Sequence, residues 1–285
     1  KKVTRLTKPN IAFIEGHGEL GEQDVYDIAQ TLAQNYNVGR VEINGKIDAL
    51  IHRTQNEDQD VKAFPSFDAI IIAKPTQPFD ERDKFLIDQY IMHGGKVLWL
   101  VEPVLATMDS LQNQESTIGL EQDLNLDDML FKYGVRLNRD LLLDLSCAAL
   151  PIRTGQVAGQ AQLEFFRWFY FPLLQAASNH PMVRNMNAIR ADFVSSMDAT
   201  TSANGIDQIP LLKTSDYTKV SGAPVFITLS MLRQSPDKRM FSSKGKNVAY
   251  LLKGSFPSLY ANRIPQEIVD DQATDFMEES KPTAM

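Results

Sequence analysis

FDAIIIA, at residues 67–73, is an almost unbroken apolar run that is followed by Pro75 and Pro78. A strand with one face in water would place a polar residue at every second position, and this run does not. The run therefore predicts a strand that is buried on both faces, as in a parallel sheet with helices on its two sides.

The segments before this strand begin the same arrangement. NIAFI, at residues 10–14, predicts an earlier strand, and apolar residues at helical spacing over residues 22–36 predict the helix that follows it. Residues 38–43 predict another strand, whereas the polar residues 44–62 predict a loop or a frayed helix. Strand, turn and helix in this order are typical of a βαβ unit.

The segments after residue 73 extend the pattern. Asp80 is expected to cap a helix over residues 81–93, and Gly94 and Gly95 are expected to end it. KVLWLV, at residues 96–101, predicts the next buried strand. Strands and helices that alternate in this way predict an α/β fold with a mostly parallel, doubly wound sheet.

Three regions are predicted along the chain. Residues 1–145 would form the α/β unit with the parallel sheet, residues 146–263 a second α/β portion, and the acidic, weakly patterned residues 264–285 a flexible tail. A helix over residues 125–133 is expected to end at Gly134. Further strands are expected at residues 135–137, 141–145, 190–196, 225–229 and 248–252.

The loops that leave the carboxyl ends of the first strands are the place to expect a site, because ligands bind there in doubly wound sheets. Three such loops are predicted, at residues 15–19, 74–78 and 102–105. The candidate residues for binding a ligand or a partner are Glu15, Gly16, His17, Gly18, Glu19, Pro75, Glu102 and Pro103.

His17 allows two interpretations. With Glu15 and Glu19 it could hold a divalent metal or act as a general base. The simpler interpretation is that Gly16 and Gly18 permit a tight turn while Glu19 caps the following helix. We adopt the simpler one, so that no metal and no cofactor are expected and His17→Ala should leave the fold nearly intact.

Other catalytic chemistries lack their motifs. Residues 16–21 match the letters of a dinucleotide fingerprint, but Glu19 and Glu22 would repel a phosphate. Cys147, the single cysteine, is not on a Gly-x-Cys-x-Gly elbow, and we expect it to be a buried small side chain. The sequence thus indicates a protein that is not an enzyme.

Charge and hydropathy exclude two further classes. The formal charge is −7, with 36 acidic and 29 basic residues, which opposes binding to nucleic acid. No apolar run approaches the length that crosses a bilayer, so the chain is expected to be a soluble piece. In FFRWFYF, residues 165–171, six of seven residues are aromatic; we expect a core element rather than a contact surface for a partner or glycan.

Five stretches resemble one protein family, the GldG-type auxiliary (substrate-binding-like) proteins of gliding-motility ABC transporters. They follow one another in the family's order over residues 10 to 263. They are EGHGE (15–19), GGKVLWL (94–100), NHPMV (179–183), IPLLKTSD (209–216) and VAYLLKGSFPSLY (248–260).

The resemblance implies a specific role. The N-terminal half would have the fold that is shared with intraflagellar-transport proteins and is related to class I glutamine amidotransferase-like and flavodoxin-like folds. The chain would be a non-enzymatic binding or scaffolding domain that faces the periplasm at the cell inner membrane, anchored through segments outside this chain. Its partners would be the ABC transporter permease and ATPase subunits or other envelope proteins. The alternative is a hydrolase-like or carbohydrate-processing enzyme that uses the His17 loop.

Overall fold

The computed structural model of the 285-residue chain describes residues 7–55, 61–111, 114–157, 160–201, 205–233, 235–264 and 275–285. Its α-helices are α1 (Tyr26–Ala33), α2 (Glu81–Met92) and α3 (Asp127–Tyr133), and short 3-10 turns lie at Asp109–Leu111, Leu229–Arg233 and Lys238–Met240. Its strands are β1 (Asn10–Glu15), β2 (Asn37–Glu42), β3 (Ile51–Gln55), β4 (Val61–Pro65), β5 (Ala69–Ala73), β6 (Lys96–Leu100), β7 (Val104–Leu105), β8 (Ser116–Glu121), β9 (Val135–Leu137), β10 (Asp140–Asp144), β11 (Cys147–Val157), β12 (Gln160–Ala176), β13 (Ile189–Arg190), β14 (Met197–Ala199), β15 (Ile206–Lys213), β16 (Thr218–Gly222), β17 (Val225–Thr228), β18 (Asn247–Gly254) and β19 (Thr283–Ala284).

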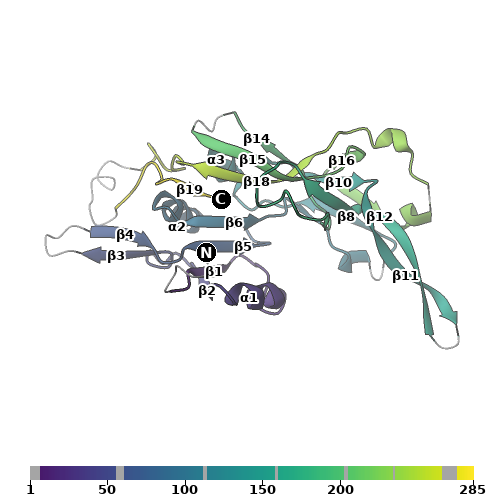
Figure 1. Ribbon diagram of the computed structural model, residues 1–285, viewed down its shortest axis with the longest axis horizontal. Helices are drawn as coiled ribbons and strands as arrows, with labels where there is room; N and C mark the ends of the chain where they lie inside the picture. The colour runs from purple at the N-terminus through teal and green to yellow at the C-terminus, as the bar shows by residue number, and fades with distance from the viewer. Residues whose placement is uncertain are drawn as a thin grey trace.

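The predicted parallel sheet is present in the first hundred residues. Its strand order is β2-β1-β5-β6, and every neighbouring pair is parallel. Helix α1 packs on the face that carries Ile11 and Phe13, whereas α2 packs on the opposite face with Ile70 and Ile72. Helices therefore cover both faces, and the doubly wound prediction is confirmed for this part (Figure 1).

The prediction that residues 146–263 form a second α/β portion is wrong. The named strand pairs of these residues are antiparallel, in a sheet of order β11-β12-β15-β18-β19 that β13 joins beside β12, and their described helical segments are only 3-10 turns. Long strands dominate because aromatic and β-branched side chains pack well on a pleated surface. The molecule as a whole is mixed α/β with a small parallel sheet, and is not mostly parallel.

Several smaller predictions can be compared with the structure. The loop or frayed helix predicted at residues 44–62 contains β3 and β4, which form an antiparallel hairpin that buries Ile51 and Ala63; residues 56–60 lie outside the described residues. The strand predicted at residues 190–196 is reduced to β13, and the helix at 22–36 to α1. The caps at Asp80 and Gly134 are confirmed, since Asp80 Oδ1 accepts the Asp83 N–H and Gly134 has a φ of 118°.

Two main cores join the layers. One lies between α2, α3 and the antiparallel strands β15 and β18, and it also contains Ile70 and Ile72 of β5, so it joins the parallel sheet to the second sheet. The other gathers Trp168, Phe169, Tyr170 and Phe171 of β12 against β10 and β17. The predicted core role of the aromatic run is confirmed for these four residues, whereas Phe165 is 71% exposed.

The last described residues are ordered rather than a free tail. Residues 275–285 pair with β18 through β19 and bury Ser280 and Thr283, so the expectation of a flexible tail does not hold for them. The Met285 and Leu252 backbones exchange two hydrogen bonds, which adds this segment to a sheet edge. Residues 265–274 of the predicted tail lie outside the described residues.

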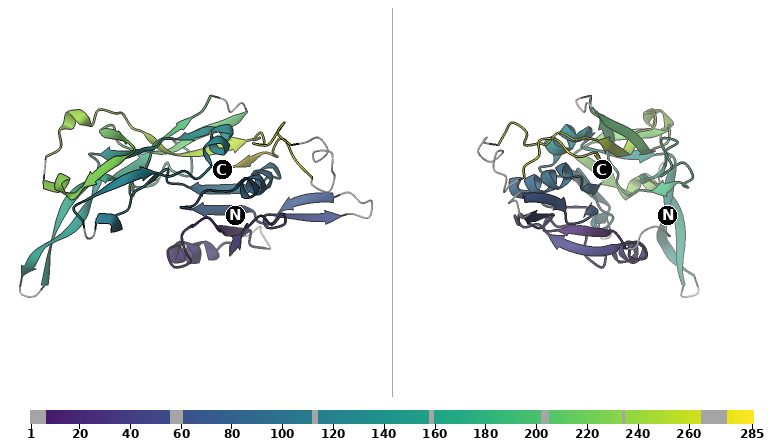
Figure 2. Two further views of the ribbon diagram at one scale, coloured as in Figure 1. Left: turned by 180° about the vertical axis from the view of Figure 1, so that it is seen from behind. Right: turned by 60° about the vertical axis from the view of Figure 1, so that its left-hand side comes forward.

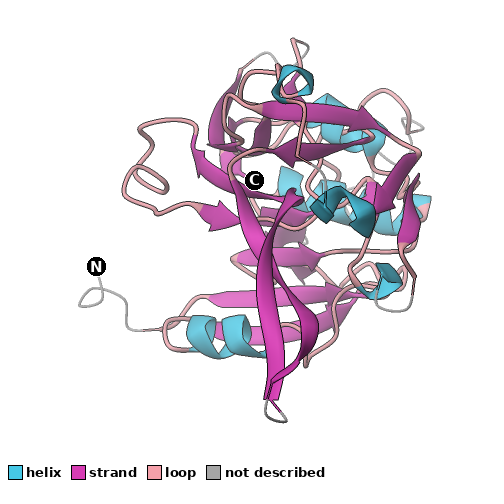
Figure 3. Ribbon diagram, turned by 90° about the vertical axis from the view of Figure 1, so that its right-hand side faces the viewer, coloured by secondary structure: helices cyan, strands magenta, loops and turns pink. Residues whose placement is uncertain are grey.

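The hairpin of β11 and β12 projects from the body of the molecule, at the end opposite to the β3–β4 hairpin (Figures 1 and 2). Seen end-on, it crosses in front of the layers and reaches the level of α1 (Figure 3). Over the part of the chain that the structure describes, no helix has the length and apolar character needed to cross a membrane.

Candidate functional site

The three predicted loops meet at the carboxyl ends of the parallel strands. The His17 carbonyl accepts backbone hydrogen bonds from Thr76 and Gln77, both at 2.9 Å. Lys74 Nζ lies 3.0 Å from Glu102 Oε2, which joins the loop after β5 to the loop after β6. The structure therefore brings the loops after β1, β5 and β6 together at one end of the sheet.

His17 lies inside this junction and is only 5% exposed. Its ring stacks on Phe79, with the ring centroids 3.8 Å apart and an angle of 17° between the planes. Its Nδ1 atom is 3.3 Å from Glu19 Oε1, and its Nε2 atom is 3.1 Å from Asp83 Oδ2. Each ring nitrogen thus faces a carboxylate.

This geometry has a consequence for the imidazole proton. A neutral imidazole carries one N–H and can donate to only one of the two carboxylates, whereas the protonated ring donates to both. In either form, both ring nitrogens face carboxylates of the same chain. Among the described residues, no group of three or more His, Cys, Asp or Glu side chains is arranged to hold a metal ion.

Glu19 does not cap the helix, contrary to the prediction. Helix α1 begins only at Tyr26, and its N-cap residue Val25 makes no side-chain cap hydrogen bond. The Glu19 carboxylate instead turns back and accepts the backbone N–H of His17 at 2.7 Å. It therefore closes the turn onto the histidine rather than onto the helix.

Gly18 shows why the turn contains glycine. Its φ of 69° lies in the left-handed region, and a Cβ atom at this position would overlap Thr76 Oγ1. The Thr76 hydroxyl also donates to the Gly18 carbonyl at 3.0 Å. The glycine lets the β5 loop approach the β1 loop closely, which supports the predicted role of the turn.

Asp83 and Phe79 complete the site, and sequence reasoning missed both. Asp83 is in the first turn of α2, where acidic residues are common, so its presence there does not mark it as a site residue. Its Oδ1 atom accepts the Gly45 N–H at 2.7 Å, which ties the loop after β2 to the same junction. The N-cap at Asp80 marks where α2 starts, but it does not indicate that the first turn lies beside the strand ends.

The other predicted site residues have structural contacts. Glu15 pairs with Arg40 at 2.6 Å at the end of β1. Burial raises the pKa of Glu102, and the neighbouring Lys74 ammonium opposes this shift. Pro75 and Pro103 are buried, and both of their carbonyls accept hydrogen bonds from Gln122, each at 2.9 Å. Glu15, Pro75, Glu102 and Pro103 therefore all make polar contacts with other residues of the same chain.

Replacing His17 with alanine is expected to lower the free energy of unfolding by about 3 kcal/mol, because Glu19 and Asp83 would lose the ring that lies between them and the ring's packing on Phe79 would be lost. Urea unfolding measures this change. The exposed His52→Ala is the control and should change stability by less than about 0.5 kcal/mol. This replaces the sequence-based expectation of a nearly intact fold, and equal stability of the two variants would contradict it.

Cys147 is half-buried rather than fully buried. Burial raises the pKa of its thiol, and the nearby Arg167 guanidinium only partly offsets that effect. A thiol of this kind is a poor nucleophile at neutral pH.

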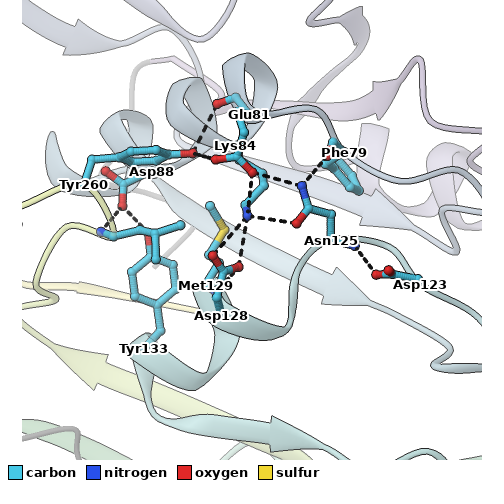
Figure 4. A network of polar contacts seen from close by, with 11 residues as sticks. Phe79, Glu81, Lys84, Asp88, Asp123, Asn125, Asp128, Met129, Tyr133 and Tyr260 are labelled. Carbon is cyan, nitrogen blue, oxygen red and sulfur yellow. Dashed lines mark hydrogen bonds and ion pairs between the residues drawn. The ribbon is translucent and has the colours of Figure 1, made fainter. Parts of the chain in front are cut away.

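A groove of about 840 Å³ lies between α3, residues 136–139 and the segment after β18. Many of its charges are paired: Arg139 contacts Glu121 and Asp127, and Arg136 contacts Asp198. Behind it, Lys84 is fully buried and its Nζ atom lies 2.9 Å from Asp128 and 3.1 Å from Glu81 (Figure 4). Sequence reasoning missed this groove because two segments that are far apart in the sequence, residues 127–139 and 257–263, form it.

Two of the quoted sequence motifs contain a serine that binds a buried carboxylate. The Ser258 hydroxyl, in the last motif, donates to the buried Asp88 at 2.7 Å. Ser215, in the motif before it, donates to the buried Asp144 through both its backbone N–H and its hydroxyl. These two serines therefore connect segments that lie far apart in the sequence.

Comparison with known proteins identifies the family. The family model described as "ABC-type uncharacterized transport system" matches residues 8–285. No curated protein matches the chain. Among solved structures, the mmIFT52 N-terminal domain is similar at 13% sequence identity and a TM-score of 0.48, over 84% of this chain and 86% of that chain.

Proposed function

We propose that this chain, which belongs to the ABC-type uncharacterized transport system family, is a non-enzymatic binding and scaffolding component of its transporter. Membership makes the chain an auxiliary component of an ABC-type transport system. The proposal adds that the domain works by contact with other proteins and not by turnover of a substrate.

The burial of His17 carries this proposal. A general base must reach the proton that it removes, and His17 is 5% exposed, with both ring nitrogens facing carboxylates of its own chain. The strand-end loops, where α/β enzymes place their catalytic groups, are joined to one another by hydrogen bonds. The alternative of a hydrolase that uses this loop has no such support.

The finer assignment is to a GldG-type auxiliary protein of a gliding-motility system. The five ordered sequence motifs support it. In this proposal the domain faces the periplasm at the inner membrane, and its membrane anchors belong to segments outside this chain. Its partners are the permease and ATPase subunits.

Co-production of the full-length protein with the permease and ATPase of its own transport system tests the proposal. We expect the three proteins to purify together in detergent in a fixed ratio, because a scaffolding component must bind its complex directly. Failure to purify together would contradict the proposal. Turnover of a compound that is lost in His17→Gln, after correction for the folded fraction, would also contradict it.

A further inference from the structure

The outer face of the three-stranded sheet β17-β8-β7 carries a cluster of large apolar side chains that are open to solvent. Its members are Leu105, Ile118, Leu120 and Phe226, and their exposed fractions are 46%, 55%, 56% and 64%. We call them the outer apolar cluster. Single exposed apolar residues are normal on a protein surface, whereas a contiguous cluster marks an interaction site.

The register of the sheet shows that the cluster is contiguous. Phe226 lies directly opposite Ile118, and Leu105 lies directly opposite Leu120. Ile118 and Leu120 are two residues apart on β8, so their side chains are on the same face. Directly opposite side chains in an antiparallel pair are neighbours, which joins all four into one surface.

The inner face of the same sheet packs against the core of the chain. Val104, Val225 and Ile227 are at most 2% exposed and belong to the core that contains Trp168. A Cβ on Gly119 would lie 3.3 Å from both Val104 and Leu141, so this face is closely packed. The sheet is therefore apolar on both faces, although only one of them is covered within the chain.

We propose that the outer apolar cluster docks an amphipathic helix of another protein of the transport system. This inference rests on the proposed function, and it names the surface and the chemistry of the contact. The cluster spans three strands, roughly 10 Å across and about 7 Å along β8. Two turns of helix are about 11 Å long and present apolar residues at positions i, i+3, i+4 and i+7, which fits this area.

The size of the cluster argues against a second copy as the occupant. Four half-exposed side chains offer about 100 Å² each, or roughly 400 Å² together. A stable interface between free proteins needs about 800 Å² from each partner. A face of half this size suits a contact inside a larger assembly, where other contacts raise the effective concentration of the partner.

The charge of the face argues against a lipid surface. The pair that continues this face beside Ile118 and Phe226, Ser116 and Thr228, is uncharged, whereas binding to anionic membranes draws on Lys and Arg side chains beside the apolar ones. The helix that docks here should accordingly present an uncharged apolar stripe.

Photo-crosslinking and a charge substitution test the inference on the full-length protein, co-produced with its permease and ATPase. A benzoylphenylalanine in place of Phe226 should crosslink to an apolar stripe of a helix in a transporter protein, identified by mass spectrometry. Phe226→Lys should reduce the recovered partner at least tenfold, because docking would bury an unpaired charge. Lysine is common on edge strands, so the variant should still fold.

Tyr217→Lys is the matched control. Tyr217 is 63% exposed, against 64% for Phe226, and lies outside the outer apolar cluster. It should retain the partner at the wild-type level. If Phe226→Lys melts more than a few degrees below the wild type, Ile118→Thr replaces it, since threonine keeps the β-branched preference for a strand.

The outcomes separate the two proposals. Full partner recovery with Phe226→Lys would overturn the docking inference and leave the proposed function intact. A crosslink from position 226 to a second copy of the chain or to lipid would also overturn it. If the wild type and the control both fail to bind the transporter, the proposed function fails, and the docking inference fails with it.

Discussion

Replacing Asp88 with alanine is expected to lower the free energy of unfolding by about 4 kcal/mol, which for a chain of this size corresponds to a drop of roughly 10 °C in melting temperature. Asp88 is 0% exposed and is one of the hydrogen-bonding centres in Figure 4. Its Oδ1 atom accepts from the Tyr133 hydroxyl at 2.6 Å and from the Leu259 N–H at 2.7 Å.

The large effect arises because the partners of Asp88 are buried donors. Its Oδ2 atom accepts from the Ser258 hydroxyl at 2.7 Å and from the Gln89 amide at 3.0 Å. The four donors come from α2, α3 and the segment after β18. Alanine would leave all four facing an apolar gap, and each unmet buried donor costs about 1–3 kcal/mol, although these costs are not additive.

Asp88→Asn separates shape from charge. The asparagine has the same shape, but its amide nitrogen would meet two of these donors, so we expect about half the loss seen with alanine. The exposed Asp48→Ala is the control and should change stability by less than about 0.5 kcal/mol. Chemical unfolding at neutral pH measures all three, and an Asp88→Ala variant as stable as the control would refute the role of Asp88.

The pH dependence has a definite sign. Burial raises the pKa of Asp88, so the folded protein keeps this proton to a higher pH than the unfolded chain does. The contribution of Asp88 to stability is therefore greatest below the unfolded pKa of about 3.9 and falls as the pH rises through the folded pKa. Asparagine does not titrate, so the stability advantage of the wild type over Asp88→Asn should increase as the pH is lowered toward 4.

Replacing Gly95 with alanine is expected to cost about 3 kcal/mol, because a Cβ atom at this position would overlap the ring of Tyr90. Tyr90 is fully buried, and its hydroxyl donates to the Phe67 carbonyl at 2.9 Å. The ring cannot move aside without breaking this bond and disturbing the core between α2 and the parallel sheet. Thermal unfolding should therefore show a clear loss of stability.

A control and a double variant make this prediction specific. Gly222→Ala should be nearly neutral, since its added Cβ would meet nothing within 4 Å. Tyr90→Leu combined with Gly95→Ala should cost less than the sum of the two single changes, because the clash disappears with the ring. Strict additivity would show that the ring is not the obstacle.

The first hundred residues were largely predictable because their signals are local. A continuous apolar run such as residues 69–73 indicates burial on both faces, and the Asp80 side chain marks the start of α2 because it accepts a backbone N–H of the first turn. The sequence did not predict the hairpin of β3 and β4, because apolar and polar residues alternate over only a few positions in each strand. Its pairing partners became apparent only in the folded chain.

The junction of strand-end loops was predictable in position but not in chemistry. Parallel strands bring the loops after β1, β5 and β6 to one end of the sheet, as expected. That His17 would lie between Glu19 and Asp83 depended on how α2 is oriented, and nothing in the spacing of residues 17 and 83 indicates it. Because the packing of Phe79 and α2 buries His17, the histidine has a structural role.

What the sequence determined by itself is the parallel α/β unit, the start of α2 at Asp80 and the end of α3 at Gly134, and the ordered motifs that place the chain beside ABC transport auxiliary proteins. The tertiary structure alone decided the antiparallel second half, the hydrogen bonds of Asp88 to Ser258 and Leu259, and the outer apolar cluster on β7, β8 and β17. The physical reason is separation along the chain. Periodicity and capping act over a few residues and leave a trace in the sequence, whereas the choice of strand partners, and contacts such as that of Asp88 with Ser258 170 residues away, arise only when the chain folds.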